Sequence, residues 1–155
     1  KNKNQNIGII YRNYNSENRE SQLIKISNAC KRMRYQLFIS NDKRLVYKYK
    51  ADGIYIPSFN NKFSHLAYST SSNFAIIGSA HNLKEIKVKE LQKVQSIFIS
   101  SLFKKNKNYL GLNRFKNLQK LTNKKVVALG GISKKNINKI SLLNISSIAG
   151  ISYFD

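Results

Sequence analysis

The sequence is poor in cysteine, proline and acidic residues. Its 155 residues include one cysteine, one proline and seven acidic residues. A single cysteine, Cys30, excludes an internal disulfide and leaves no CxxC pair for redox chemistry. We therefore expect a reduced, cytoplasmic setting, with Cys30 as a small buried residue on a helix rather than a reactive thiol.

Further absences concern catalytic groups and membranes. With only seven Asp and Glu residues, paired-carboxylate catalysis is difficult to assemble. The sequence also lacks a catalytic triad, a His/Cys metal cluster and a Walker-type phosphate loop. No apolar run approaches the ~18–20 residues that cross a bilayer, and the polar opening KNKNQN is not a signal peptide. Association with a membrane is therefore not expected.

Positive charge is abundant: 28 Lys and Arg residues give a formal net charge of +21. A nucleic-acid binder usually gathers its basic residues on one face or interleaves them with stacking aromatics. Here lysine is spread along the whole chain together with Asn, Ile and Ser, which indicates a general drift in composition. We expect attraction to phosphorylated small molecules and no specific nucleic acid partner, although a charge-driven nucleic-acid binder is a rival hypothesis.

Short apolar runs alternate with longer polar segments of helical period. The runs predict strands at 7–11, 35–40, 52–57, 74–79, 96–101, 125–130 and 146–152. The intervening segments predict helices at 21–34, 41–50, 60–71, 82–94, 111–122 and 134–143. The predicted strands are nearly continuous in Ile, Val, Leu, Phe and Ala, which is typical of parallel strands buried on both faces. In the helix at 21–34, one face carries Leu23, Ile26, Ala29, Cys30 and Met33.

This alternation predicts an α/β fold with one domain over residues 1–155. Either an open doubly wound sheet or a closed barrel fits the repeat. Seven strands are one fewer than a TIM (β/α)8 barrel needs. The chain begins with Lys rather than Met, so we expect the missing first strand to precede residue 1.

Two adjacent glycines, Gly130 and Gly131, follow the apolar run VVAL. In parallel α/β folds the ligand site lies at the carboxyl ends of the strands, and glycine there allows the backbone to approach a ligand. The predicted helix that follows would offer free N–H groups to an anion. The next run ends in Gly150, Ile151 and Ser152. We predict a phosphate site at these two strand ends, although the glycine pair could simply form a tight turn.

Other strand ends carry polar groups as well. They are Arg12, the pair Asn41–Asp42, Ser79 with His81, and the lysines Lys104, Lys105 and Lys107. An arginine and a carboxylate at one mouth suggest recognition of a polyanion with a divalent metal. Each has a simpler alternative: Asn41 or Asp42 could cap the next helix, His81 could be structural, and the lysines could be a solvated loop.

Eight motifs in order carry a resemblance to a known family. They are YRNY, FISND, ADGIYIPS, IIGSAHN, ISSLFKK, LGL, VVALGGIS and IAGIS, and they cover essentially the whole chain. In this order they resemble the thiamine phosphate synthase and thiazole tautomerase family, whose members are TIM barrels. The resemblance implies a thiamine-biosynthetic transferase that joins a pyrimidine pyrophosphate to a thiazole phosphate. In that family pyrophosphate leaves with Mg²⁺ assistance, and the thiazole nitrogen captures the resulting carbocation.

The resemblance also implies roles for individual residues. Arg12 would contact the pyrophosphate, Asn41 would hold the pyrimidine substrate, and Asp42 would bind Mg²⁺. Ser79 would belong to the pyrimidine site. The thiazole-phosphate cradle would be formed by Gly130, Gly131, Ile151 and Ser152. Lys105 or Lys107 could substitute for the positive charge of the family's lysine in contacts with the substrate.

Four stretches of the sequence depart from the family pattern. Tyr14 stands where the family has a lysine, and the segment 55–60 lacks the family's second metal-binding aspartate. A threonine-rich loop followed by lysine is replaced by residues 105–108, and Ser100 and Ser101 occupy the place of a tautomerase histidine. An alternative hypothesis is therefore a catalytically degenerate barrel that binds a thiamine-related phosphate as a sensor or partner protein.

Overall fold

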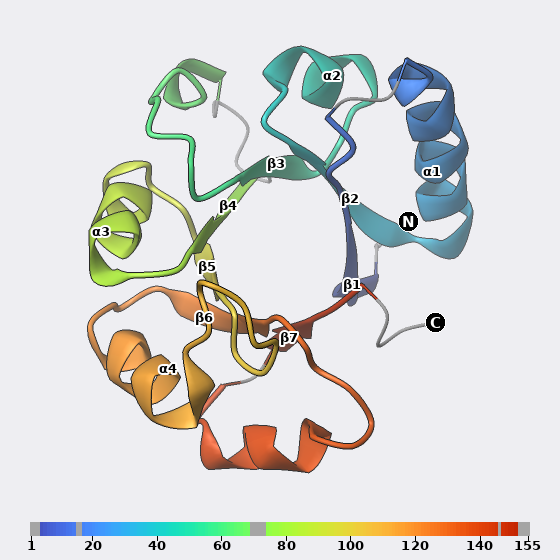
Figure 1. Cartoon of the computed structure of the whole chain (residues 1–155). Helices are drawn as coiled ribbons and strands as arrows, with labels where there is room; N and C mark the ends of the chain where they lie inside the picture. The colour runs from blue at the N-terminus through green and yellow to red at the C-terminus, as the bar shows by residue number, and fades with distance from the viewer. Residues whose placement is uncertain (1–3, 15–16, 69–73, 146, 152–155) are drawn as a thin grey trace. The chain divides into compact units, whose positions relative to one another are not determined.

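The computed structural model describes residues 4–14, 17–68, 74–145 and 147–151. The chain divides into two compact units, Lys1–Ile76 and Ile77–Asp155. Strands and helices alternate in both units, and the neighbouring strands within each are parallel (Figure 1). The predicted parallel α/β fold is thereby confirmed. Among the described helices, none combines the length and apolar character that crossing a membrane requires.

Among its described residues, the first unit contains three complete parallel strands in chain order. Its elements are β1 (Asn4–Tyr11), α1 (Arg19–Met33), β2 (Tyr35–Ser40), α2 (Lys43–Lys48), β3 (Gly53–Ile56) and the 3₁₀ helix η1 (Leu66–Tyr68). Strand β2 pairs with β1 on one side and with β3 on the other. All four residues of β3 are buried, as the continuous apolar run predicts. The carboxyl ends of β2 and β3 therefore lie side by side.

The second unit continues the same pattern. Its elements are β4 (Ala75–Ala80, which starts in the first unit), α3 (Leu83–Leu91), β5 (Ser96–Ile99), α4 (Gly111–Lys120), β6 (Lys125–Leu129), the 3₁₀ helix η2 (Ile137–Leu142) and β7 (Ser147–Ala149). Strand β5 pairs with β4 and β6, and β6 pairs with β7. Each crossover between parallel strands needs a connecting segment, which α3, α4 and η2 provide.

Helix α1 presents a narrower buried face than its sequence predicts. Leu23, Ser27 and Cys30 are buried at a spacing of four and three residues, so the predicted burial of Cys30 on this helix is confirmed. Ala29 and Met33, which we predicted on the same face, are exposed, and Met33 is 51% exposed. Because Ser27 takes a buried position, the face that packs inward is rotated away from Ala29 and Met33.

Over the residues that the structure describes, two of the predicted helices form as short 3₁₀ segments; residues 69–71 of the first lie outside the described part. The segment predicted at 60–71 contains η1, and the segment at 134–143 contains η2, which begins three residues later than expected. Before η2, the Ser133 amide donates to Asn136 Oδ1, and Asn136 Nδ2 donates to the Gly131 carbonyl oxygen. These side-chain hydrogen bonds compete with helical backbone hydrogen bonds, so the helix begins only at Ile137. No regular helix therefore begins directly after the glycine pair.

Candidate functional site

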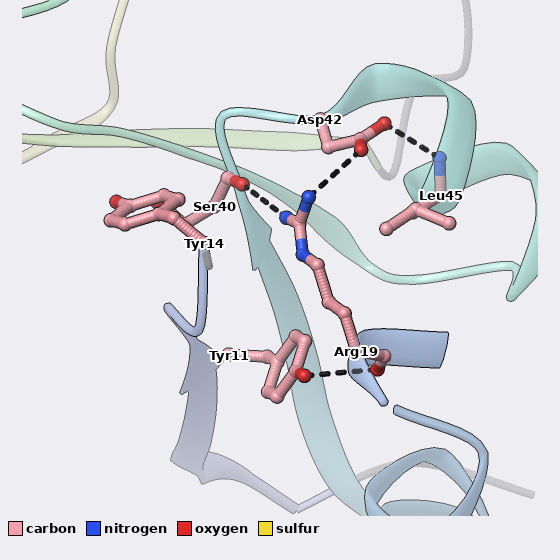
Figure 2. Close-up of polar contacts among 6 residues, drawn as sticks. All are labelled: Tyr11, Tyr14, Arg19, Ser40, Asp42 and Leu45. Carbon is pink, nitrogen blue, oxygen red and sulfur yellow. Dashed lines mark hydrogen bonds and ion pairs between the residues drawn. The ribbon is translucent and has the colours of Figure 1, made fainter. Parts of the chain in front are cut away.

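A polar cluster in the first unit centres on Asp42, at the end of β2. Its Oδ1 accepts a hydrogen bond from the Leu45 amide at 3.1 Å, which makes Asp42 the N-cap of α2. Its Oδ2 accepts from Arg19 Nη1 at 3.1 Å, and Arg19 Nη2 donates to the Ser40 carbonyl oxygen (Figure 2). The side chains of this ion pair are 20% and 22% exposed, so water screens it only in part. Asp42 thus joins α1 to the start of α2.

Two tyrosines extend this cluster. The Tyr11 hydroxyl donates to the Arg19 carbonyl oxygen at 2.9 Å, and burial raises the pKa of Tyr11 although the nearby Arg19 charge lowers it (Figure 2). The Tyr14 hydroxyl lies 2.5 Å from Ser40 Oγ, and Ser40 is fully buried. Tyr14 occupies the position where the family resemblance implies a lysine. A phenol that is hydrogen-bonded to the end of β2 therefore replaces a cation.

A second cluster lies at the ends of β2 and β3. Asn60 Nδ2 donates to Asn41 Oδ1 at 2.5 Å, and Asn60 Oδ1 accepts from the Lys62 amide at 2.7 Å. Asn41 itself has a φ of 58°, and its amide donates to the Tyr55 carbonyl oxygen. These residues border a cavity of about 520 Å³, which we call the amide–lysine cavity. It is lined by Asn41, Lys43, Ile54, Ile56, Phe59, Asn60, Asn61, Lys62, Ser64 and His65.

Aromatic rings lie close to these clusters in the first unit. The guanidinium of Arg12 lies 5.4 Å from the centroid of the Tyr55 ring, and Tyr55 is almost completely buried. Tyr14 and Phe59 meet edge to face with ring centroids 6.1 Å apart. The Arg12 side chain is exposed at the end of β1, in a cation–π arrangement that leaves its charge accessible to water. Its predicted contact with pyrophosphate stays a prediction.

The carboxylates of the first unit do not suit a magnesium ion. Magnesium needs carboxylate oxygens that can face the ion, but both Asp42 oxygens accept hydrogen bonds, one of them from a guanidinium that repels a cation. Among the described residues, no group of three or more His, Cys, Asp or Glu side chains could hold a metal. The other acids engaged in hydrogen bonds or ion pairs are Glu20, Asp52, Glu85 and Glu90. The donor set therefore does not fit the metal that the family resemblance implies.

Substitution of Asp42 is expected to destabilise the first unit. Asp42→Ala removes the N-cap of α2 and leaves Arg19 without this carboxylate, so we expect a loss of about 1–2 kcal/mol in the free energy of unfolding. Asp42→Asn keeps a capping oxygen and is expected to cost less than half as much. Urea denaturation followed by circular dichroism measures both. Equal losses for the two variants would contradict the capping role.

In the second unit, the end of β4 carries Ser79 and His81. Ser79 is buried, at 5% exposure. The His81 ring Nδ1 lies 2.9 Å from Glu85 Oε2, which also accepts from the His81 amide. Asn82 caps α3 by accepting from the Glu85 amide at 2.9 Å. His81 is therefore held by the first turn of α3, as its structural alternative predicts.

The glycine pair packs against residues 101–110, which connect β5 to α4 and which we call loop 101–110. The amides of Phe103 and Lys104 both donate to the Gly130 carbonyl oxygen, at 2.8 and 3.2 Å. A Cβ at Gly130 would lie 2.6 Å from Ser101 Oγ, and one at Gly131 would collide with the Lys104 amide. Their φ values of 103° and 74° also favour glycine. Close packing of two loops thus requires both glycines.

The other predicted site residues of the second unit that the structure describes are exposed. Lys105 and Lys107 are exposed on loop 101–110, and Ile151 is 88% exposed after β7. Ser152 lies outside the described residues. Loop 101–110 is fastened by Ser101, whose amide donates to the Asn108 carbonyl oxygen and whose hydroxyl donates to the Lys104 carbonyl oxygen. The phosphate and substrate roles of these residues stay predictions.

Several residues of these clusters were missed at the sequence level. Arg19, Ser40 and Asn60 lie within helices, strands or turns whose polar residues carry no distinctive spacing. Lys43 and Lys62 are two lysines among many, so their place at one cavity is visible only in the fold. The deviation of residues 55–60 from the family pattern is the one signal that could have directed attention to Asn60.

Comparisons with known proteins agree on one family. A family model described as thiamine monophosphate synthase matches residues 6–154. A thiamine-phosphate synthase of Methanococcus vannielii is 30% identical over 121 residues, which are 75% of this chain and 58% of that protein. One of Methanococcus maripaludis is 27% identical over 139 residues, 84% of this chain and 67% of that protein. The solved structure of a thiamine phosphate pyrophosphorylase from Pyrococcus furiosus is similar with a TM-score of 0.76 at 20% identity, over 93% of this chain and 71% of that one.

Proposed function

Because the chain belongs to the thiamine monophosphate synthase family, a family of thiamine biosynthesis, we propose that it joins a pyrimidine pyrophosphate to a thiazole phosphate and releases pyrophosphate. The chain spans about 58% of the length of the first Methanococcus relative. The resemblance of eight ordered motifs at the sequence level and the match to the family model support the same assignment.

The amide–lysine cavity is the observation that best supports this activity. It lies at the carboxyl ends of β2 and β3, and its lining includes two lysines, three asparagines and no acidic residue. A cavity of about 520 Å³ with this lining suits a small, highly charged organic phosphate. Asn41 belongs to this lining, in agreement with its proposed contact to the pyrimidine substrate.

The chemistry requires stabilisation of a leaving group. The bond between the pyrimidine methylene carbon and the pyrophosphate oxygen breaks, and its electron pair leaves with pyrophosphate. The thiazole nitrogen then supplies the electron pair of the new carbon–nitrogen bond. Fixed cations and amide N–H donors stabilise the charge that develops on the leaving oxygen, and we assign this task to Arg12 and to the lysines of the cavity.

Recognition of the substrates is assigned to residues of the second unit as well. We propose that Ser79, Lys105 and Lys107 contact substrate and that Gly130 and Gly131 bind the thiazole phosphate together with Ile151 and Ser152. The exposed lysines of loop 101–110, which is bonded to Gly130, support this assignment. Positive charge on that loop would attract the phosphate to the glycine pair.

The finer features of the protein are part of the same proposal. We propose a single (β/α)8 barrel domain, supported by the parallel strand pairs and by the similarity to the Pyrococcus structure. The partners we propose are small phosphorylated substrates rather than a nucleic acid or a membrane, and the setting is the cytoplasm.

A turnover assay tests the proposed function. The purified chain is incubated with both substrates, and thiamine phosphate and pyrophosphate are measured by chromatography. The proposal predicts the two products in equal amounts, and neither product when the thiazole phosphate is omitted. Binding of both substrates without product would instead support the non-catalytic alternative, and the proposal would be wrong.

A further inference from the structure

We infer that the amide–lysine cavity binds the pyrophosphate group through side-chain cations and amides, without a divalent metal ion. This inference rests on the proposed function, since it concerns how the same leaving group is held. Three observations in the first unit support it. Two lysines line the cavity, Asn60 is part of an amide network, and the Asp42 carboxylate is bonded to Arg19 and to the Leu45 amide.

The charge of the cavity lining is positive. Lys43 is half-buried at the start of α2, and Lys62 follows the turn after β3. Both belong to the lining, which includes no acidic side chain. A pyrophosphate ester carries several negative charges at neutral pH, and two ammonium groups beside it supply the neutralisation that a dication would otherwise provide.

Asn60 is fixed in an orientation that a carboxylate could not adopt. Its Oδ1 accepts from the Lys62 amide, and so its Nδ2 must face Asn41 Oδ1. An aspartate at position 60 would place two acceptors against each other at this contact. The segment after β3 therefore contributes a neutral amide network at the cavity, where the family resemblance implies a metal-binding acid.

Asp42 follows Asn41 in sequence but does not line the cavity. Its carboxylate is directed to Arg19 and to the Leu45 amide, as Figure 2 shows. The residues on either side of it, Asn41 and Lys43, do belong to the lining. The cavity thus receives an amide and an ammonium group from this segment, while the carboxylate serves the contact between α1 and α2.

Calorimetric titration with inorganic pyrophosphate tests the inference on the full chain. Titrations are run at ~0.15 M salt, to suppress non-specific attraction to a chain of charge +21, in EDTA and again in excess Mg²⁺. We expect saturable binding in EDTA with a dissociation constant within about threefold of that in Mg²⁺. Binding that is seen only with Mg²⁺ overturns the inference and leaves the proposed function intact.

A matched pair of variants locates the site. Lys43→Met with Lys62→Met removes both cavity cations, and we expect the dissociation constant in EDTA to rise roughly tenfold or more. The control, Lys25→Met with Lys31→Met, removes the same charge from exposed positions on α1 and is expected to change binding by less than about twofold. Equal weakening by the two pairs, or no pyrophosphate binding by the wild type in either buffer, overturns the inference. In that last case the turnover assay still decides the proposed function separately.

Discussion

Replacement of Gly131 by alanine is expected to lower the free energy of unfolding by about 3 kcal/mol or more. Two costs combine at this position. The backbone has a φ of 74°, which an L-residue adopts only with strain, and the new Cβ would collide with the Lys104 amide. Relief of the collision requires loop 101–110 to move away from β6. Chemical denaturation followed by circular dichroism measures the loss.

Gly111→Ala is the matched control for this prediction. Gly111 has a similar φ of 65°, but the nearest atom to its Cβ would be the Tyr109 hydroxyl at 3.3 Å, the end of a side chain. Its substitution should cost about 1 kcal/mol, which is the backbone strain alone. If Gly131→Ala costs no more than Gly111→Ala, the close packing of the two loops is not what requires glycine at 131.

Because of Lys89, the free energy of unfolding is expected to increase as the pH rises through the alkaline range. This lysine of α3 is fully buried, and its ammonium donates to Gln92 Oε1 at 2.8 Å. Burial lowers the pKa of Lys89 from 10.5 to about 8, although the Glu85 charge acts in the opposite direction. The unfolded chain therefore holds this proton more tightly than the folded chain between these two pH values. As the pH rises through this window, the folded state gains up to about 3 kcal/mol relative to a variant without the group.

The measurement compares the wild type with Lys89→Met at pH 7, 8, 9 and 10.5. Below pH 8 the wild type carries the full cost of burying a charge, and above 10.5 this cost is absent from both proteins. The difference in unfolding free energy should thus move by about 2–3 kcal/mol in favour of the wild type as the pH rises. Lys84→Met, at an exposed position on the same helix, is the control for removing a lysine side chain from α3. Parallel curves for wild type and Lys89→Met would contradict the buried-ammonium account.

Local sequence patterns predicted the strands well because burial on both faces leaves a clear apolar run. The strand predicted at 35–40 coincides with β2, and the run at 125–130 contains β6. Helix faces were less predictable, since Ser27 is buried on α1 while Met33 is exposed. Which face packs inward depends on the neighbouring strand, and a single sequence does not encode that contact locally.

The clusters at the strand ends were predicted only in outline. The sequence identified Asn41, Asp42 and the glycine pair because each follows an apolar run. It could not decide between capping and metal binding for Asp42, since that choice depends on Arg19, 23 residues away in the chain. The need for two glycines likewise depends on residues distant in the sequence, because the glycines pack against loop 101–110.

Our central proposal is that this chain stabilises the departing pyrophosphate with its own cations and amides. The most direct measurement is the initial rate of thiamine phosphate formation by the purified chain, in EDTA and in excess Mg²⁺, with both substrates saturating. We predict product in both buffers, with rates that agree within about threefold. A reaction that proceeds in Mg²⁺ and stops in EDTA would contradict the account.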